Sequence, residues 1–257
     1  MHESQEHCSL KLTALTKTVW DGKMQEIRSP RELARERTMA EIMRLAREQL
    51  ASHGAAALSL RAVAKDLGIV SSAIYRYVSS RDELLTLLVV EAYDDLGDAV
   101  DSALKRASLA ADERFAVLAR AVRAWAIAEP ARYGLLFGTP VPGYHAPAGQ
   151  TVESGTRVVV RLMGIIEDAW TVGDITQPET VPTLSPSLAA DVEALRSEYE
   201  LSSPGWLIAR GLGAWSGLFG AVSFEVFGQY GPNTLSEANE LFEFSMRVTA
   251  GNLGFRR

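Results

Sequence analysis

The chain has 257 residues, of which 47% are hydrophobic and 23% charged, and its formal net charge is −6. This composition excludes long disorder, collagen-like repeats and a protein with many membrane spans, and the length suits one large domain or two smaller ones. As an average over the whole chain, the acidic pI near 5.4 argues against nucleic acid as a partner.

The first 30 residues show no secretory pattern, because no apolar stretch there is followed by a small-residue cleavage site. The lone cysteine, Cys8, forms no intrachain disulfide and builds no thiolate metal site by itself. Both observations favour the cytoplasm. Four basic and four acidic residues without helical periodicity predict a flexible arm over 1–30. Met24 just precedes the first helical pattern, so residues 1–23 have two interpretations: part of the natural chain, or a segment upstream of its start.

Helical periodicity dominates the rest of the chain, and no proline lies between Pro30 and Pro130. Proline-rich segments at 138–149 and 173–186 predict surface loops. Alternation of apolar and polar residues does not persist outside the helical patterns, so the predicted fold class is all-α. The expected helices cover 31–52, 60–67, a short segment ending near 78, 81–106, 111–129, 132–137, 151–171, 187–200, 205–228 and 235–252.

Residues 60–78, LRAVAKDLGIVSSAIYRYV, have the pattern of a helix-turn-helix, in which two short helices flank a turn that contains glycine. Ser59 is the expected N-cap of the first helix, and Ser71 or Ser72 that of the second. Gly68 is expected to adopt the positive φ that the tight turn requires, and the small Ala64 lets the helices cross closely. The side chains expected to point inward are Val63, Leu67, Ile69, Ile74 and Val78.

The second helix of such a unit presents one face to the major groove of DNA. Here that face would consist of Ser71, Ser72, Tyr75, Arg76 and Tyr77. The alternative is an ordinary pair of packed helices in which both tyrosines lie in a core.

The segment after the hairpin favours DNA binding. Residues 75–85, YRYVSSRDELL, together with the hairpin and the helix before it, resemble the amino-terminal module of the TetR family of bacterial transcriptional regulators. Val70, Val78 and Arg81 stand where that family has Ser, Phe and Lys. The resemblance implies a three-helix DNA-binding domain over 31–80. A larger helical domain over 81–257 would then bind a ligand and dimerise.

Side-chain chemistry and this resemblance together assign the expected contacts with a double-stranded operator. Arginine suits guanine, whereas serine pairs with any base, so the operator sequence does not follow. Base-edge contacts are expected from Ser71, Ser72 and Arg76. Phosphate contacts are expected from Ser59, Arg61, Tyr75, Tyr77 and Arg81.

The distribution of charge along the chain shows that the acidic pI does not argue against DNA as a partner. Residues 31–90 carry nine basic and seven acidic side chains, whereas residues 91–257 carry thirteen basic and twenty-one acidic ones. The acidity therefore lies outside the expected DNA-binding module. Because that module is only weakly basic, a few specific contacts are expected to dominate its affinity.

Large apolar side chains accumulate after residue 110 and predict a pocket for a small apolar or aromatic ligand. The alternative for each of them is that it fills the core. The segment 215–220, WSGLFG, resembles the Trp-x-x-x-His-Gly motif of a subgroup of the same family, with Phe219 in place of the histidine. The candidate pocket residues are Trp125, Tyr133, Phe137, Met163, Trp170, Trp215 and Phe219.

The longest apolar run, 211–224, is shorter than the roughly 20 residues that span a bilayer, so it is interpreted as a buried helix without membrane association. Small residues along it let a second helix approach closely. With the helix that follows, they predict a four-helix contact between two copies, which would place two recognition helices about 34–36 Å apart on a palindromic operator. The candidate interface residues are Gly213, Gly217, Ala221, Leu241, Phe244 and Val248.

Enzyme interpretations find little support. The four histidines lack metal-ligand spacing, and the chain has neither a Gly-x-Ser-x-Gly motif nor a phosphate loop, so no metal and no cofactor are expected. The predicted function is a ligand-responsive, homodimeric transcriptional regulator, expected to be a repressor that a small molecule releases from its operator. The alternative is a ligand-binding or interaction protein whose helix-turn-helix no longer binds DNA. The ligand and the target genes do not follow from the sequence.

Overall fold

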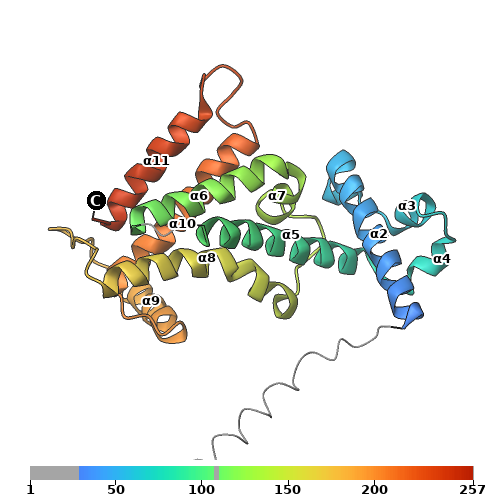
Figure 1. Cartoon of the computed structure of the whole chain (residues 1–257), viewed down its shortest axis with the longest axis horizontal. Helices are drawn as coiled ribbons and strands as arrows, with labels where there is room; N and C mark the ends of the chain where they lie inside the picture. Colours follow the sequence, from blue (N-terminus) through green and yellow to red (C-terminus); the bar gives the residue numbers. More distant parts are fainter. Residues whose placement is uncertain (1–28, 107–109, 257) are drawn as a thin grey trace, which may run out of the picture. The chain divides into compact units, whose positions relative to one another are not determined.

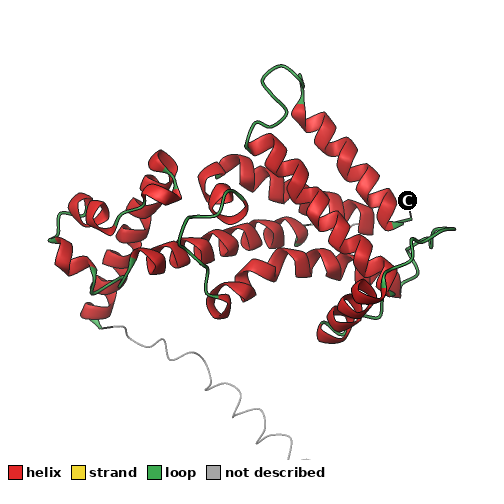
Figure 2. Ribbon diagram, turned by 180° about the vertical axis from the view of Figure 1, so that it is seen from behind, coloured by secondary structure: helices red, strands yellow, loops and turns green. Residues whose placement is uncertain are grey.

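The computed structural model describes residues 29–106 and 110–256, and within these ranges the chain is built from helices without a β-strand (Figures 1 and 2). The predicted all-α fold class is confirmed. The helices are α2 (Pro30–His53), the 3-10 turn η1 (Ala55–Ala57), α3 (Leu60–Asp66), α4 (Ser71–Ile74), α5 (Arg81–Leu104), α6 (Ala111–Ala128), α7 (Pro130–Phe137), α8 (Ala148–Thr171), α9 (Pro186–Glu198), α10 (Gly205–Val226) and α11 (Ala238–Leu253).

The chain divides into two compact units between Glu41 and Ile42, inside α2. The second unit contains the helix-turn-helix and all later helices, and every tertiary contact described below lies within it. The predicted arm over 1–30, with Cys8, falls outside the described residues except for its last two positions.

A small apolar core holds the helix-turn-helix together. Helices α2, α3 and α4 each contribute fully buried side chains to this core, and so do the first turns of α5. Removing this apolar surface from water stabilises the arrangement by about 25 cal/mol per Å². The residues of this core are Ile42, Leu45, Ala46, Leu50, Leu58, Leu60, Val63, Ala64, Ile74, Val78, Leu84 and Leu85.

The start of α5 is fixed by capping. The Ser80 hydroxyl oxygen accepts a hydrogen bond from the Glu83 backbone N–H at 3.1 Å, and the Glu83 carboxylate accepts one from the Ser79 N–H at 2.6 Å. Ser80 is therefore the N-cap of α5. The Glu83 carboxylate also accepts a hydrogen bond from the Ser79 hydroxyl. The bonds from the hydroxyl and the N–H of Ser79 hold the pKa of Glu83 below its usual value. A negative charge in the first turn also suits the helix dipole.

The C-terminal helices surround a second, larger core. Helix α5 packs against α6, α7 and α8, while α10 packs against α6, α8, α9 and α11 (Figure 1). Most expected helix limits agree with the structure to within a few residues. Helix α7 begins two residues earlier than predicted, at Pro130, because proline has the right φ for a first helical residue and lacks only an N–H that would have no helical partner.

Candidate nucleic-acid interface

The turn between α3 and α4 has the predicted geometry. Gly68 adopts φ = +74°, its N–H donates to the Lys65 carbonyl at 3.0 Å, and the Ile69 N–H donates to the Ala64 carbonyl at 3.0 Å. This pair of hydrogen bonds is the Schellman motif, which ends a helix on a left-handed residue. A Cβ added to Gly68 would meet nothing within 4 Å, so its backbone conformation, not a lack of space, favours glycine here.

The start and the length of α4 differ from the prediction. The N-cap is Val70, not Ser71 or Ser72, and no side chain caps this helix. The α-helix ends at Ile74, and the chain continues to 77 as a turn in which the Tyr77 N–H donates to the Ile74 carbonyl at 2.9 Å. The i→i+3 bonds of this turn replace the expected last helical turn.

One face of α4 and its following turn is open to solvent. Ser71, Ser72, Tyr75 and Arg76 are exposed, whereas Ile74 is fully buried on the opposite side. Because 48% of the Tyr75 surface is exposed, the alternative that places this tyrosine in a core is wrong. Tyr77 is half-buried. The five side chains predicted to face DNA thus lie on one short segment held by buried neighbours.

The three other predicted DNA contacts differ in their surroundings. Arg61 on α3 is exposed, and Ser59 is half-buried at the N-cap of α3 without a side-chain capping bond. The Arg81 guanidinium donates to three carbonyls: that of Leu58 at 3.1 Å, that of Ala55 at 3.0 Å and that of Ala56 at 3.2 Å. The Arg81 side chain therefore joins the start of α5 to the turn before α3. Its position in the sequence segment 75–85 does not predict this structural role.

Four of the seven candidate pocket residues meet in one aromatic cluster, which we define as Tyr133, Phe137, Trp215 and Phe219. The ring centroids of Phe137 and Phe219 are 4.3 Å apart, and those of Trp215 and Phe219 are 4.2 Å apart. The Tyr133 hydroxyl lies 2.8 Å from that of Ser223. Burial raises the pKa of Tyr133, and the contact with Ser223 partly opposes that rise.

The other three candidates pack against the same hydrophobic core but make no ring contact with these four among the described residues. Trp170 packs edge-on against Trp206, with ring centroids 6.3 Å apart, and Trp125 lies under the guanidinium of Arg132 at 5.7 Å. The Met163 sulfur packs against α10, where a Cβ on residue 211 would come within 2.7 Å of it. All seven side chains therefore belong to or pack against one core, and ring contacts join four of them.

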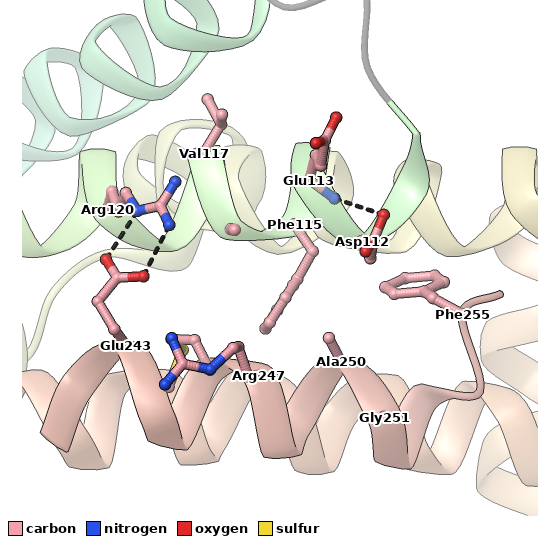
Figure 3. Close-up of a pocket in the computed structure, with 12 residues that line it drawn as sticks. Asp112, Glu113, Phe115, Val117, Arg120, Glu243, Arg247, Ala250, Gly251 and Phe255 are labelled. Atoms are coloured by element: carbon pink, nitrogen blue, oxygen red, sulfur yellow. Dashed lines mark hydrogen bonds and ion pairs between the residues drawn. The ribbon is translucent and has the colours of Figure 1, made fainter. Parts of the chain in front are cut away.

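Among the clefts that the described C-terminal residues form, two are lined by none of the seven candidate residues. The first, of about 350 Å³, lies between α6 and α11 (Figure 3). The second, of about 320 Å³, lies between α5, α7 and the beginning of α8. Tyr93 lines the second cleft and touches Phe137 edge-on, with centroids 6.0 Å apart, so this cleft adjoins the aromatic cluster.

The candidate dimer residues lie on α10 and α11, which pack against each other. Gly213, Gly217, Phe244 and Val248 are exposed, and Ala221 and Leu241 are half-buried. Helix α10 has 22 residues and is longer than the apolar run 211–224. Among the described helices it is one with the length and composition of a membrane span, and 39% of its most apolar 18-residue stretch is buried. The prediction of a buried helix is wrong for its outward face, which the single chain leaves uncovered.

A helix-turn-helix with an exposed second helix, followed by a helical domain, defines a class of DNA-binding regulator. Residues 42–88 match the family described as bacterial regulatory proteins, tetR family, and residues 115–249 match the tetracyclin repressor-like C-terminal domain. The chain belongs to the TetR family of transcriptional regulators, and it is a regulator, not an enzyme.

Individual relatives agree with this assignment. The chain is 46% identical over 218 residues to the HTH-type transcriptional regulators Rv1816 of Mycobacterium tuberculosis and Mb1846 of Mycobacterium bovis, covering 84% of this chain and 92% of each relative. The crystal structure of SCO4313, described as a candidate regulatory protein, is 35% identical with a TM-score of 0.70, covering 87% of this chain and 100% of that one. A tetR-family protein of Rhodococcus RHA1, at 19% identity and a TM-score of 0.54, covers 85% and 98% and supports the fold alone.

Proposed function

We propose that this regulator binds a palindromic operator as a homodimer, represses transcription there, and is released by a small molecule bound in its C-terminal region. The observation that carries the proposal is the exposed segment of Ser71, Ser72, Tyr75 and Arg76, held by the fully buried Ile74. Such a rigid, exposed row is what direct contact with base edges and phosphates requires. In this proposal residues 31–80 form the DNA-binding domain, and residues 81–257 sense the ligand and dimerise.

The outward face of α10 and α11 supports a dimer. A Cβ added at Gly213, Gly217 or Gly220 would meet nothing within 4 Å, so the packing of a single chain does not require glycine there. Close approach of a partner helix does favour such a stripe. Phe244 and Val248 on the neighbouring helix are exposed by 58% and 47%, which adds apolar surface beside the stripe. We assign this face to a second copy of the chain.

The aromatic cluster and the adjoining cleft support a ligand site. Apolar side chains with a few polar groups are the usual lining of small-molecule sites, and the polar side chains that line this cleft include Tyr93, Tyr144, Thr151 and Thr156. The Tyr144 hydroxyl lies 3.0 Å from that of Thr86 on α5. A ligand here would therefore touch the helix that continues from the helix-turn-helix. We propose that it shifts α5 and so changes the separation of the two recognition helices.

Selection of bound sequences from random double-stranded DNA tests the proposal, using the purified full chain at several salt concentrations. We expect enrichment of a palindrome whose half-sites are centred about one helical turn, 10 base pairs, apart. No enrichment would overturn DNA recognition by this segment, and an asymmetric single site would overturn the dimer. Transcription in vitro from a promoter carrying the selected site should fall when the protein is added, whereas a rise would overturn repression.

A further inference from the structure

The lining of the cleft between α5, α7 and the beginning of α8 indicates what kind of molecule this cleft takes. Its volume of about 320 Å³ is at the lower end of the range for small-molecule sites, roughly 300–1,000 Å³. Apolar side chains reach it from all three helices: Val89 on α5, Leu135 and Leu136 on α7, and Val152 on α8. Within the described part of the chain, none of its lining residues carries a charge. A charged ligand would therefore leave water without gaining a partner of opposite charge, which is unfavourable.

The described lining carries four hydroxyl groups, and those of Thr151 and Thr156 already donate to the backbone. Each reaches the carbonyl four residues earlier in the chain: that of Pro147 at 3.1 Å and that of Val152 at 2.8 Å. Because a hydroxyl group has a single hydrogen, neither threonine has one left to donate to a ligand.

The Tyr144 hydroxyl is also occupied as a donor. It lies 3.0 Å from the Thr86 hydroxyl, which itself donates to the Asp82 carbonyl at 2.9 Å. Since Thr86 has no second hydrogen, Tyr144 is the donor of this pair and Thr86 the acceptor. The hydrogen of Tyr144 is therefore directed at α5 and not into the cleft.

Tyr93 supplies the fourth hydroxyl, which makes no hydrogen bond to the rest of the described chain. Its ring is held in place, because it packs edge-on against Phe137 and lies against Gly155, where an added Cβ would come within 3.4 Å of it. Burial raises the pKa of Tyr93, and the neighbouring Tyr144 adds to the rise, so the hydroxyl keeps its hydrogen at neutral pH. The cleft thus offers one fixed donor whose hydrogen is available to a ligand.

We propose that this cleft binds a compact, uncharged and largely apolar molecule whose polar group is a hydrogen-bond acceptor, such as a ketone or ester carbonyl, that takes the hydrogen of Tyr93. This assignment rests on the proposed function, because it names the class of ligand for the same site. An anion would find no cation in the lining. A ligand without an acceptor would leave the Tyr93 hydroxyl unpaired and out of water.

Ligand-observed NMR titration of the full chain with three compounds of similar size tests the proposal. The compounds are 1-tetralone, 1-methylenetetralin, in which a CH₂ group replaces the carbonyl oxygen, and the anion tetralin-1-carboxylate. We expect 1-tetralone to bind, and the carboxylate to bind about tenfold or more weakly than the ketone. Tyr93→Phe keeps the ring and removes the donor. It should weaken 1-tetralone about fivefold, the effect of one neutral hydrogen bond, and leave 1-methylenetetralin unchanged.

Two further variants complete the test. Tyr199→Phe, directly after α9 and outside the cleft lining, is the matched control and should bind all three compounds like the unmodified chain. Val152 lines the cleft and is 54% exposed, so Val152→Trp fills the cleft without entering the core and should abolish binding of 1-tetralone. Thermal unfolding checks that the variants are folded. If Val152→Trp does not fold, Ala146→Trp, at another exposed position of the lining, takes its place.

Three results would overturn the proposal. They are the absence of 1-tetralone binding up to about 1 mM, the weak end of specific affinity, a carboxylate that binds as tightly as the ketone, and a Tyr93→Phe variant that affects 1-tetralone and 1-methylenetetralin alike. Release of a labelled operator, measured separately by fluorescence anisotropy, tests the proposed function instead. Binding of 1-tetralone that depends on Tyr93 but releases no operator would support this ligand class and contradict release through this site.

Discussion

Tyr75 is the proposed DNA contact whose loss should least affect folding, because its side chain is half exposed while the adjacent Ile74 anchors the segment in the core. We expect Tyr75→Ala to cost about 1 kcal/mol per protomer, hence roughly thirtyfold in operator affinity for a dimer. Fluorescence anisotropy with a labelled operator measures this loss. The midpoint of thermal unfolding and the oligomeric state should not change. Unchanged affinity would remove Tyr75 from the DNA interface.

Arg81 presents the opposite case, since its guanidinium already serves three backbone carbonyls. We expect Arg81→Ala to destabilise the protein by about 1–3 kcal/mol, because carbonyl groups of a partly buried turn lose their donors. Thermal or urea unfolding measures this change. Arg81→Lys is the informative companion, because it keeps the charge but loses the planar donor geometry. A lysine variant as stable as the unmodified protein would show that charge alone suffices.

At the scale of elements, α5 is held on two sides by ion pairs. Arg47 of α2 lies 2.6 Å from Glu91, which ties α5 to the helix-turn-helix. Arg157 of α8 donates to Asp98 at 2.6 Å and to Asp101 at 2.7 Å. The Arg157 side chain packs onto α5 where residue 97 is glycine, and a Cβ there would come within 2.6 Å of it. Helix α5 is thus connected to both halves of the proposed switch.

The connection between α5 and α8 should depend on pH. Partial burial alone would raise the pKa of Asp101, but hydrogen bonds from Arg161 and Arg157 outweigh it and hold the pKa below 3.8. A lowered folded-state pKa means that these contacts stabilise the protein above pH 3.8 and lose that effect as the pH falls through the lowered pKa. We expect Arg157→Ala to cost about 1 kcal/mol at pH 7 and progressively less in acid.

Urea unfolding of the unmodified protein and Arg157→Ala at a series of pH values measures this difference. Arg196→Ala is the matched control, because the ion pair of Arg196 with Glu193 lies within α9 and joins it to no other helix. Its effect should stay near zero at every pH. A difference for Arg157→Ala that does not shrink toward low pH would show that its packing on α5, not its charge, stabilises the contact.

At the scale of the whole molecule, the proposed dimer depends on the open face of α10 and α11. We expect Phe244→Glu and Gly217→Leu each to shift the protein to monomers, because one places a charge and the other a bulky side chain in the proposed interface. Light scattering after size exclusion measures the mass, and operator affinity should fall with it. Val160→Glu, which replaces an apolar residue exposed by 42% on α8, is the control. Dimers in both variants would place the interface elsewhere.

The features that can be predicted from the sequence are those with local causes. Gly68 and Ser80 form hydrogen bonds with backbone groups three residues away, so their roles can be predicted from a short stretch of sequence. The start of α4 is less visible, because Val70 has no capping side chain and its conformation depends on how α4 packs. The candidate pocket depends on helix packing over longer distances. For this reason Phe137 of α7 meets Phe219 of α10, whereas Trp170 of α8 meets Trp206 instead.

The placement of the tryptophans gives the protein a built-in optical reporter. All four tryptophans of the described residues, at 125, 170, 206 and 215, lie in the C-terminal helices, and the helix-turn-helix contains tyrosine but no tryptophan. Excitation at the red edge of the indole absorption would therefore follow events in the C-terminal helices, including the aromatic cluster, where the Trp215 ring lies 4.2 Å from that of Phe219. With Trp20 replaced by phenylalanine, the remaining emission would come from the C-terminal helices, while a labelled operator reports separately on the helix-turn-helix.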